Sequence, residues 1–254
     1  MSTLTFAVAD TGAMVGRSVR HTVRNLESLL MSVILPVVLM LMFVYVFGGA
    51  IDPTGHYANY VVPGIILLCT GYGAASTAVD VAQDLSEGIV DRFRSMPIVS
   101  SAVLTGHVVA SLARNALATV LVIGVAYLTG FRPDAGALEW LAVAGMLLLW
   151  VLALSWVAVC FGLLVRTVEG ANGFTFLVLF LPYLSSAFVP TDTMRAGLRA
   201  VADVQPVTPI TETLRGLLLG TGIGSYGLQA IVWCAGLLLV AYAGAAVLFR
   251  RRTA

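Results

Sequence analysis

The stretch Glu87-Gly88-Ile89-Val90-Asp91-Arg92-Phe93-Arg94-Ser95-Met96-Pro97 is dense in charge, whereas the chain on either side of it is mostly apolar. Glu87 and Asp91 are four residues apart and share one face of a helix, and two arginines flank Phe93. Pro97 ends or bends that helix, because proline lacks an N–H and its ring clashes with the preceding turn. A charge run of this kind is most simply a solvated loop. The sharper interpretation is a docking helix for a soluble partner.

The composition around this stretch predicts an all-α membrane protein, with residues 1–254 forming a single helical transmembrane domain. Hydrophobic residues make up 59% of the chain and charged residues 11%, less than half the charged fraction of about 25% in a soluble domain. The net charge of +1 gives no basis for binding nucleic acid, which needs a basic patch.

All 14 basic residues are arginine. A chain without lysine has no Walker A loop, because the lysine of that loop reaches the nucleotide phosphates. Any ATP that drives this protein is therefore bound by another chain. The sequence also shows no catalytic constellation, so we expect no enzyme activity from this chain by itself. The three cysteines lie within apolar runs, where we expect no disulfide and no metal site.

Six apolar runs have the length and composition of membrane spans. We predict an interfacial elbow helix at 10–26, a short cytoplasmic helix within 84–100, and an extracytoplasmic segment at 190–226. Within that last segment, 194–202 and 210–219 are two helical pieces that form a re-entrant hairpin. The predicted spans are 28–47, 61–82, 108–128, 141–165, 171–189 and 228–249.

The arginines indicate how the spans are oriented. The loops on one side carry more arginine than those on the other, and arginine-rich loops remain cytoplasmic. Both termini and the opening stretch are then cytoplasmic in a multi-pass protein of the bacterial inner membrane. Arg114 lies inside the third predicted span, where it is either functional or extends towards the headgroups. The side richer in arginine holds Arg17, Arg20, Arg24, Arg92, Arg94, Arg166, Arg250, Arg251 and Arg252.

Two groups of aromatic residues lie at helical spacing in the spans. Phe176, Phe180 and Tyr183 follow an i, i+4, i+7 pattern, and Phe43 and Phe47 follow i, i+4. Packing against lipid or other helices is the more common role of such residues. The alternative is a surface along the path of an apolar, polycyclic substrate.

The opening stretch, continued by Ile98, Ala102-Val103-Leu104 and Gly106, resembles the loop between spans two and three of type-two ABC export permeases. The daunorubicin-resistance branch is the most similar. Val62-Pro63-Gly64, the run from Leu184 to Pro190, Pro206 with Thr208, and Arg215 also agree with that family. Gln205 stands where the family commonly has asparagine, and Arg195 where it often has proline.

The resemblance implies six spans, an elbow helix, and a coupling helix that contacts a separate ATP-binding subunit. Two such subunits would hold ATP and magnesium, while this chain holds no cofactor. A second permease chain, identical or a paralogue, would complete the membrane path for a hydrophobic or amphipathic drug, antibiotic or lipid. The implied coupling residues are Glu87, Gly88, Asp91, Arg92, Phe93, Arg94, Met96 and Pro97.

Other functions make different demands on the sequence. A polysaccharide or glycolipid exporter of the same superfamily would favour a wide path rich in hydroxyl groups. A membrane-embedded lipid-modifying enzyme needs polar catalytic residues at one depth, and a channel or secondary transporter needs ionisable residues near the middle of the membrane. The apolar aromatic residues favour export of hydrophobic molecules.

Replacing the aromatic residue of the coupling stretch tests whether it docks a partner. An aromatic anchor at the centre of an interface typically contributes about 2 to 4 kcal/mol to binding, and charges at the rim contribute less. We expect Phe93→Ala to reduce co-purification of the ATP-binding subunit and transport-linked ATPase more than reversal of Asp91 or Arg92 does. If Phe93→Ala leaves both at wild-type level, the stretch is a solvated loop.

Overall fold

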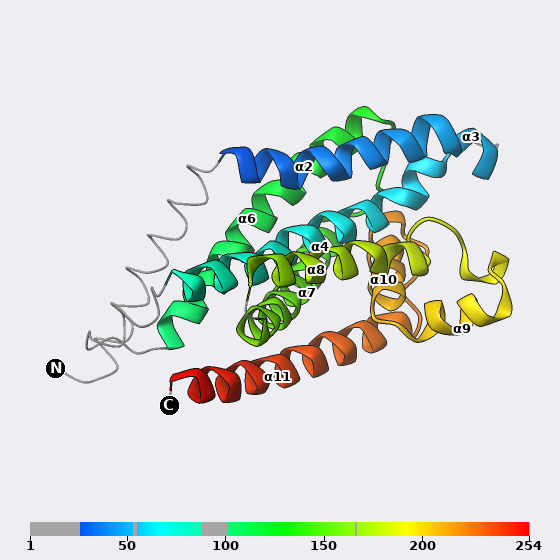
Figure 1. Cartoon of the computed structure of the whole chain (residues 1–254). Coiled ribbons are helices and arrows are strands. Elements are labelled where there is room, and N and C mark those ends of the chain that lie inside the picture. Colours follow the sequence, from blue (N-terminus) through cyan, green and yellow to red (C-terminus); the bar gives the residue numbers. More distant parts are fainter. Residues whose placement is uncertain (1–25, 53–54, 88–100, 166, 254) are drawn as a thin grey trace.

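The computed structural model describes residues 26–52, 55–87, 101–165 and 167–253, and every regular element in these ranges is helical. The elements are arranged as one elongated bundle (Figure 1). They are α2 (Leu26–Leu41), the π-helical η1 (Met42–Phe47), α3 (Gly48–Ile51), α4 (Tyr57–Ser86), α6 (Ser101–Leu128), α7 (Ala137–Leu164), α8 (Val168–Phe180), the 3-10 turns η2 (Leu181–Leu184) and η3 (Thr191–Thr193), α9 (Ala196–Val204), α10 (Val207–Leu219) and α11 (Tyr226–Thr253).

Five helices in the described part of the chain are long and apolar enough to cross a membrane: Ser32–Ile51, Tyr57–Ser86, Val103–Leu128, Ala137–Leu164 and Tyr226–Arg250. The predicted span at 171–189 corresponds to a shorter apolar helix, Val168–Leu184. It is short because Pro182 lies in the 3-10 turn η2, after which the chain leaves the helix. Regular backbone suits a membrane interior, since its hydrogen bonds are satisfied within the helix.

Helix α4 is the centre of the bundle. Twenty of its 30 residues are buried, and it packs against α2, α6, α7 and α8. Small residues allow this close approach. A Cβ atom at Gly64 would lie 2.6 Å from the Cβ of Ala187, and one at Gly71 would lie 3.2 Å from Val178.

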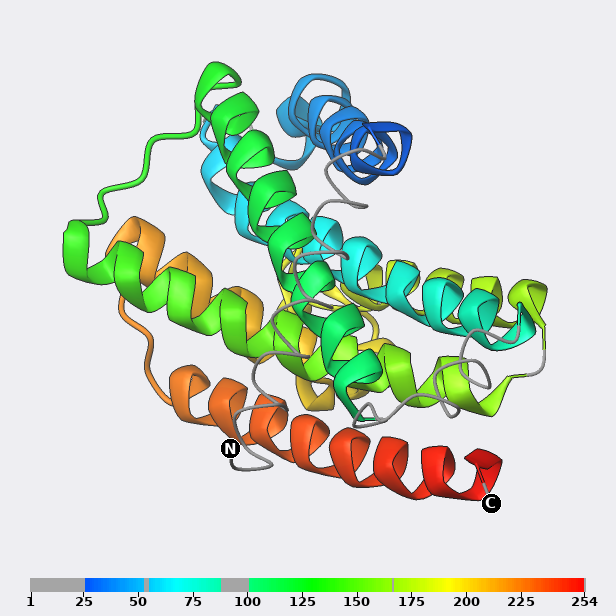
Figure 2. The ribbon, with the colours of Figure 1, turned by 90° about the vertical axis from the view of Figure 1, so that its left-hand side faces the viewer.

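Helices α2 and α11 lie at the outside of the bundle, on opposite sides of α4 (Figure 2). In the most apolar stretch of each of these two spans, Ser32–Ile51 and Tyr226–Arg250, only 17% of the residues are buried. The apolar surface of α11 that is covered packs mainly against α7. Tyr242 of α11 meets Trp156 of α7 edge to face, with ring centroids 4.8 Å apart.

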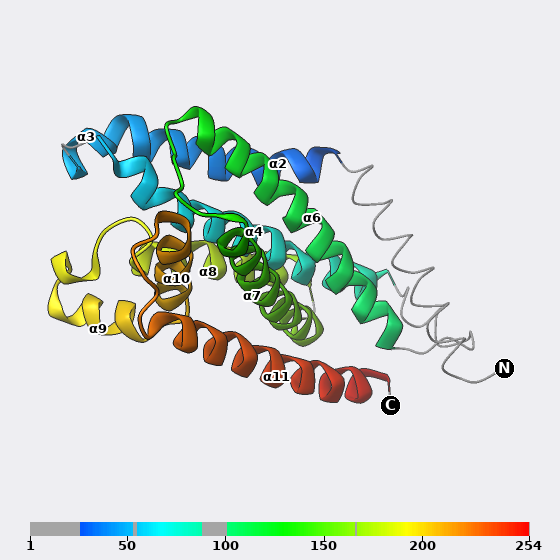
Figure 3. The same ribbon diagram turned by 180° about the vertical axis from the view of Figure 1, so that it is seen from behind.

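The two ends of the bundle differ. We call the end that holds α9 and α10 the cap end, and the end where α4 finishes and α6 begins the base end (Figures 1 and 3). Helix α10 packs against α4, α7 and α11, and ten of its 13 residues are buried. It ends at Gly220, whose φ of +66° lies in the left-handed region that glycine adopts without strain. Two helices thus occupy the region predicted to hold two helical pieces.

Two glycines of α7 offer a matched test of this packing. A Cβ at Gly162 would lie 2.7 Å from the carbonyl oxygen of Ala78 in α4, whereas a Cβ at Gly145 meets nothing within 4 Å. Overpacking of a close contact costs about 1 to 3 kcal/mol. We expect Gly162→Val to lower the thermal unfolding midpoint of the detergent-solubilised protein and Gly145→Val to leave it near wild type. Equal midpoints for the two variants would contradict this account of the α4–α7 contact.

Candidate functional site

Most of the predicted coupling residues lie outside the described part of the chain: Gly88, Asp91, Arg92, Phe93, Arg94, Met96 and Pro97. The predicted elbow helix, except its last residue, lies outside it as well. Glu87 is described and caps the C-terminal end of α4. Its carboxylate accepts a hydrogen bond of 2.9 Å from Nε2 of Gln83 in the preceding turn, and the residue is exposed. The coupling role of these residues remains a prediction.

The aromatic residues predicted from two separate spans meet at the cap end. Phe43 stacks on Phe188 with ring centroids 4.5 Å apart, and Tyr183 stacks on Phe188 at 4.8 Å. Phe47 continues the series beyond Phe43 at 5.7 Å, and Phe180 lies 6.1 Å from Tyr183. We call these five residues the aromatic cluster. It joins the end of the first span to the end of α8.

Phe188 is the residue that spacing did not identify as part of this cluster. It lies five positions after Tyr183, and the chain leaves the helix at the end of η2, between these two residues, which breaks the helical spacing. The signal that could have identified it is Pro182, which predicts that the helix ends shortly after Tyr183 and that the chain changes direction before Phe188. Phe176 points elsewhere: its side chain is 63% exposed, and it is not in the series of ring contacts that the described residues form.

Hydrogen bonds from α4 hold the backbone beneath the aromatic cluster. The hydroxyl of Tyr57 donates to the carbonyl oxygen of Phe188 at 2.8 Å, and the hydroxyl of Tyr60 donates to that of Ser186 at 3.0 Å. Phe188 is only 3% exposed. Its ring is therefore fixed by covered contacts, whereas Phe47 and Phe180 are exposed at 43% and 59%.

Arg215 of α10 also bonds to the backbone beneath the aromatic cluster. Its guanidinium donates to the carbonyl oxygens of Tyr60 and Ser186, at 3.1 and 3.0 Å from Nη2, and forms an ion pair with Glu212. The group also lies 3.8 Å from the centroid of the Tyr60 ring. A charge that is 93% covered needs such partners, because its desolvation is otherwise uncompensated. The exposed fraction of Arg215 is 7%.

A second polar group lies towards the base end, between α4 and α6. Arg114 points into the bundle and contacts the carboxylate of Asp80 at 3.3 Å, with further hydrogen bonds to Thr77 and to the carbonyl oxygen of Gly73. Closer to the base end, one turn along α4 and two turns along α6, His107 meets the carboxylate of Asp84 at 3.0 Å. These two pairs connect the helices on either side of residues 88–100.

Hydroxyl and amide groups extend these contacts from α6 to α7. Ser111 of α6 and Ser155 of α7 share a hydrogen bond of 2.8 Å, and the amide of Asn115 donates to the carbonyl oxygen of Ser111. The Asn115 side chain lies against Gly73, where a Cβ atom would be 2.3 Å from its Oδ1. Across the described residues, no group of three or more His, Cys, Asp or Glu side chains could hold a metal ion.

Comparison with known proteins gives the class to which this arrangement belongs. Residues 9–219 match the family model described as ABC-2 type transporter. The chain is 29% identical over 212 residues to the daunorubicin resistance ABC transporter permease protein DrrB1 of Streptomyces coeruleorubidus, covering 83% of this chain and 72% of that protein. It is 24% identical over 194 residues to a protein of Mycobacterium tuberculosis named probable doxorubicin resistance ABC transporter permease protein DrrC, covering 75% and 69%.

The chain therefore belongs to the ABC-2 type transporter family. It is the membrane component of an ABC transporter, and its apolar helices make it a multi-pass membrane protein. The predicted resemblance to type-two ABC permeases is confirmed.

Two arginines at the cap end test how much the buried contacts of Arg215 contribute to stability. Arg215 and Arg199 each pair with an acid on their own helix, but the Arg199 side chain is 52% exposed and that of Arg215 9%. Removing one partner of a buried pair costs about 3 to 5 kcal/mol, and an exposed pair contributes about 0 to 1 kcal/mol. Glu212 is partly exposed, so we expect Arg215→Met to cost about 2 to 4 kcal/mol.

The measurement is the thermal unfolding midpoint of each variant in the same detergent. Arg215→Met should lower it clearly, and Arg199→Met should leave it within error of wild type. A larger decrease in the midpoint for Arg199→Met than for Arg215→Met would show that the ion pair on the exposed helix α9 stabilises the cap end more than the buried contacts of Arg215 do.

Proposed function

We propose that this chain is the permease subunit of an ATP-driven exporter that moves hydrophobic or amphipathic small molecules, of the drug or antibiotic kind, out of the cytoplasm or the inner leaflet. Membership of the ABC-2 family supports the transporter class. The names of the relatives, which refer to daunorubicin and doxorubicin resistance, support the substrate class. ATP and magnesium would be held by a separate ATP-binding subunit, present in two copies.

The aromatic cluster is the observation that carries the substrate class. Stacked rings attract flat aromatic molecules, because offset stacking adds about 0.5 to 1.5 kcal/mol per pair to the burial of apolar area. Phe47 and Phe180 are the exposed members, so they can meet a substrate, while the buried ring of Phe188 keeps their neighbours in place. A carbohydrate path would instead favour hydroxyl and amide groups at this position.

The proposed topology has six spans, with both termini cytoplasmic. The short helix Val168–Leu184 would be the fifth span, extended by the irregular residues 185–189 to cross the membrane. The excess of arginine on one side supports this orientation. It places the cap end outside, with α9 and α10 as a re-entrant hairpin. Residues 84–100 would lie in the cytoplasm, and the elbow helix at 10–26 would lie at the cytoplasmic membrane interface.

The proposed assembly needs a second permease chain, identical or a paralogue. The exposed apolar surface of α2 and η1 supports this, because it borders the aromatic cluster and includes Tyr45 and Val46 of η1, exposed at 67% and 68%. A partner on that side would enclose the cluster between two chains. The substrate would then pass between the two half-bundles when the ATP-binding subunits close.

Transport by the assembled complex tests this function directly. Inside-out membrane vesicles that contain this chain and its ATP-binding subunit should accumulate daunorubicin when ATP is added, and vesicles with either chain alone should not. ATP hydrolysis by the purified permease without a partner would contradict the proposal, since the chain has no lysine for a Walker A loop.

Variants of the aromatic residues separate a substrate contact from packing. Loss of one stacking partner corresponds to about 0.5 to 1.5 kcal/mol, so we expect Phe47→Ala and Phe180→Ala to raise the KM for daunorubicin about 2- to 10-fold with normal assembly. Phe176→Ala is the matched control, because Phe176 is similarly exposed on α8 but outside the cluster. If the three variants behave alike, the cluster serves packing only.

A further inference from the structure

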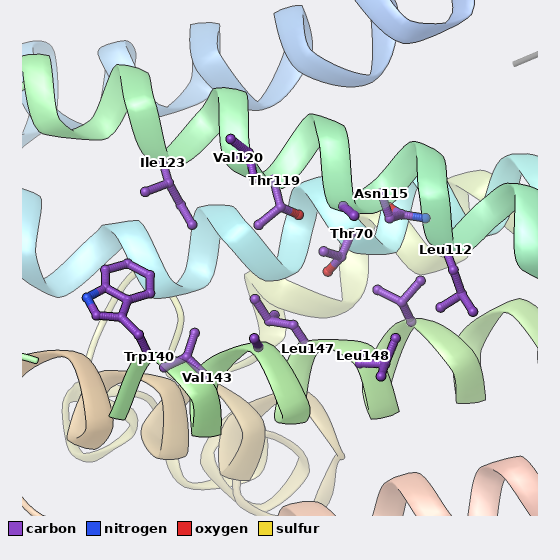
Figure 4. Close-up of a pocket in the computed structure, with 13 residues that line it drawn as sticks. Thr70, Leu112, Asn115, Thr119, Val120, Ile123, Trp140, Val143, Leu147 and Leu148 are labelled. Carbon is purple, nitrogen blue, oxygen red and sulfur yellow. The ribbon is translucent and has the colours of Figure 1, made fainter. Parts of the chain in front are cut away.

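Helices α6 and α7 form the walls of a groove that the aromatic cluster does not include. The lining residues of α6 run from Leu112 to Ile123, and those of α7 from Trp140 to Val151. On both helices they follow the same spacing of i, i+3, i+4, i+7, i+8 and i+11, so each wall is one face over three helical turns. Thr70 of α4 lies between the walls at the floor (Figure 4).

The groove is a wedge that closes towards the base end. There the hydrogen bond between Ser111 and Ser155 draws α6 and α7 together. Towards the cap end the two helices diverge, and the extended segment 129–136 connects them (Figures 2 and 3). Phe131 of that segment is fully buried and its backbone N–H donates to Ala126, which anchors the segment at the end of α6.

Most of the groove lining is apolar. The sequences 115–131 and 140–165 contain no charged residue. Four lining residues carry a polar group: Thr70, Asn115, Thr119 and Trp140. The hydroxyl of Thr70 donates to the carbonyl oxygen of Leu67 and the amide nitrogen of Asn115 donates to that of Ser111, whereas the buried Oδ1 of Asn115 accepts no hydrogen bond from the described residues. Most of the surface between the helices is therefore apolar, which suits a part of a ligand that carries few hydrogen-bonding groups.

The dimensions fit a narrow, elongated ligand. Eleven residues of helix correspond to a length of about 16 Å. The cavity volume is about 280 Å³, below the range of about 300 to 1,000 Å³ that is typical of sites for drug-sized ligands. Such a volume spread over that length leaves room for a single hydrocarbon chain rather than for fused rings.

The groove opens sideways, onto the surface that the bilayer surrounds. Val120 and Leu148, one from each wall, are 66% and 57% exposed, and the small residues Ala116 and Ala144 beside them are exposed as well. Both walls lie within helices that are long and apolar enough to span the membrane. An unfilled groove there would lack the dispersion contacts that its lining atoms make with a ligand.

Groups suited to a lipid headgroup lie at the wide end. Trp140 lines the groove in the first turn of α7, and an indole there suits the boundary between hydrocarbon and headgroups. The exposed Arg132 lies in the connecting segment, where its Nη1 donates to the carbonyl oxygens of Tyr127 and Phe131. These bonds hold a cation beside the end of α6, at a level where a phosphate group would lie.

We propose that this groove binds one acyl chain of a phospholipid, with the headgroup at Trp140 and Arg132 and the chain directed towards Asn115. The bound chain fills the wedge between α6 and α7 and supports their divergence at the cap end. This site is separate from the aromatic cluster and does not depend on which molecule the transporter exports.

The test measures phospholipid retained by the purified full-length chain. The protein is reconstituted in vesicles of palmitoyl-oleoyl-phosphatidylglycerol and palmitoyl-oleoyl-phosphatidylcholine, extracted in mild detergent, and examined by native mass spectrometry for bound lipid. Ala144→Phe fills the groove from an exposed position, and Ala142→Phe is the control on the same helix, exposed but outside the lining. We expect Ala144→Phe to lower lipid retention about tenfold, equivalent to about 1.4 kcal/mol, and Ala142→Phe to leave it unchanged.

Two further variants keep the proposal testable if Ala144→Phe unfolds. Ala116→Phe fills the groove from the opposite wall and should reduce retention similarly. Arg132→Gln should reduce retention of phosphatidylglycerol more than that of phosphatidylcholine. Circular dichroism and the thermal midpoint establish that each variant is folded.

Three outcomes would overturn the proposal. The first is equal lipid retention in Ala144→Phe, Ala116→Phe and Ala142→Phe. The second is loss of daunorubicin binding with unchanged lipid retention, which would make the groove a cargo site. The third is a change from dimer to monomer by light scattering with unchanged lipid retention, which would make it a contact with a second permease chain. Failure of daunorubicin transport in the wild-type complex would affect the proposed function alone.

Discussion

Close packing around α4 is the constraint on which the rest of the structure depends. Helices in a membrane gain little from burying apolar side chains, because lipid tails are equally apolar, so association depends on short contacts and hydrogen bonds. Gly64 and Gly73 on α4, and Gly162 on α7, provide three such contacts, to Ala187, Asn115 and Ala78. Each lies where α4 meets a different part of the chain. These close contacts explain why most residues of α4 are buried.

The polar contacts fix how the neighbouring helices are positioned along α4. Arg215 ties the cap helix α10 to the start of α4 and to Ser186, and Arg114 ties α6 to the base half of α4. Both arginines are 7% exposed, so their charges are stable only with acidic or carbonyl partners in place. The cap and base ends are therefore each held in register with the same central helix. Between these two points the α6–α7 wedge stays open.

The aromatic cluster and the groove show two uses of apolar surface in one bundle. The cluster brings together rings from the first span and the end of α8, and its inner ring is covered on all sides. The groove is formed by two helices that are drawn together at the base end, where Ser111 and Ser155 share a hydrogen bond, and that diverge towards the cap end (Figure 2). Flat rings suit the first and a flexible chain the second. With the proposed lipid in the groove, a transporter of hydrophobic molecules would keep that lipid apart from its substrate.

The sequence by itself determined the helical class, the membrane location and the ABC-2 family, because apolar run length and the motif at 87–97 are local properties. It also identified Arg114 as a charge within a span, Arg215 as a residue that agrees with the family, and four of the five clustered aromatic residues by their helical spacing. Only the tertiary structure decided that Arg114 pairs with Asp80, that Phe188 joins two aromatic groups, and that α6 and α7 diverge into a groove. These features depend on contacts between residues up to 155 positions apart, as in the bond from Arg215 to Tyr60. Local spacing carries no information about such contacts, since the irregular backbone after Pro182 and the extended segment 129–136 change the direction of the chain between them.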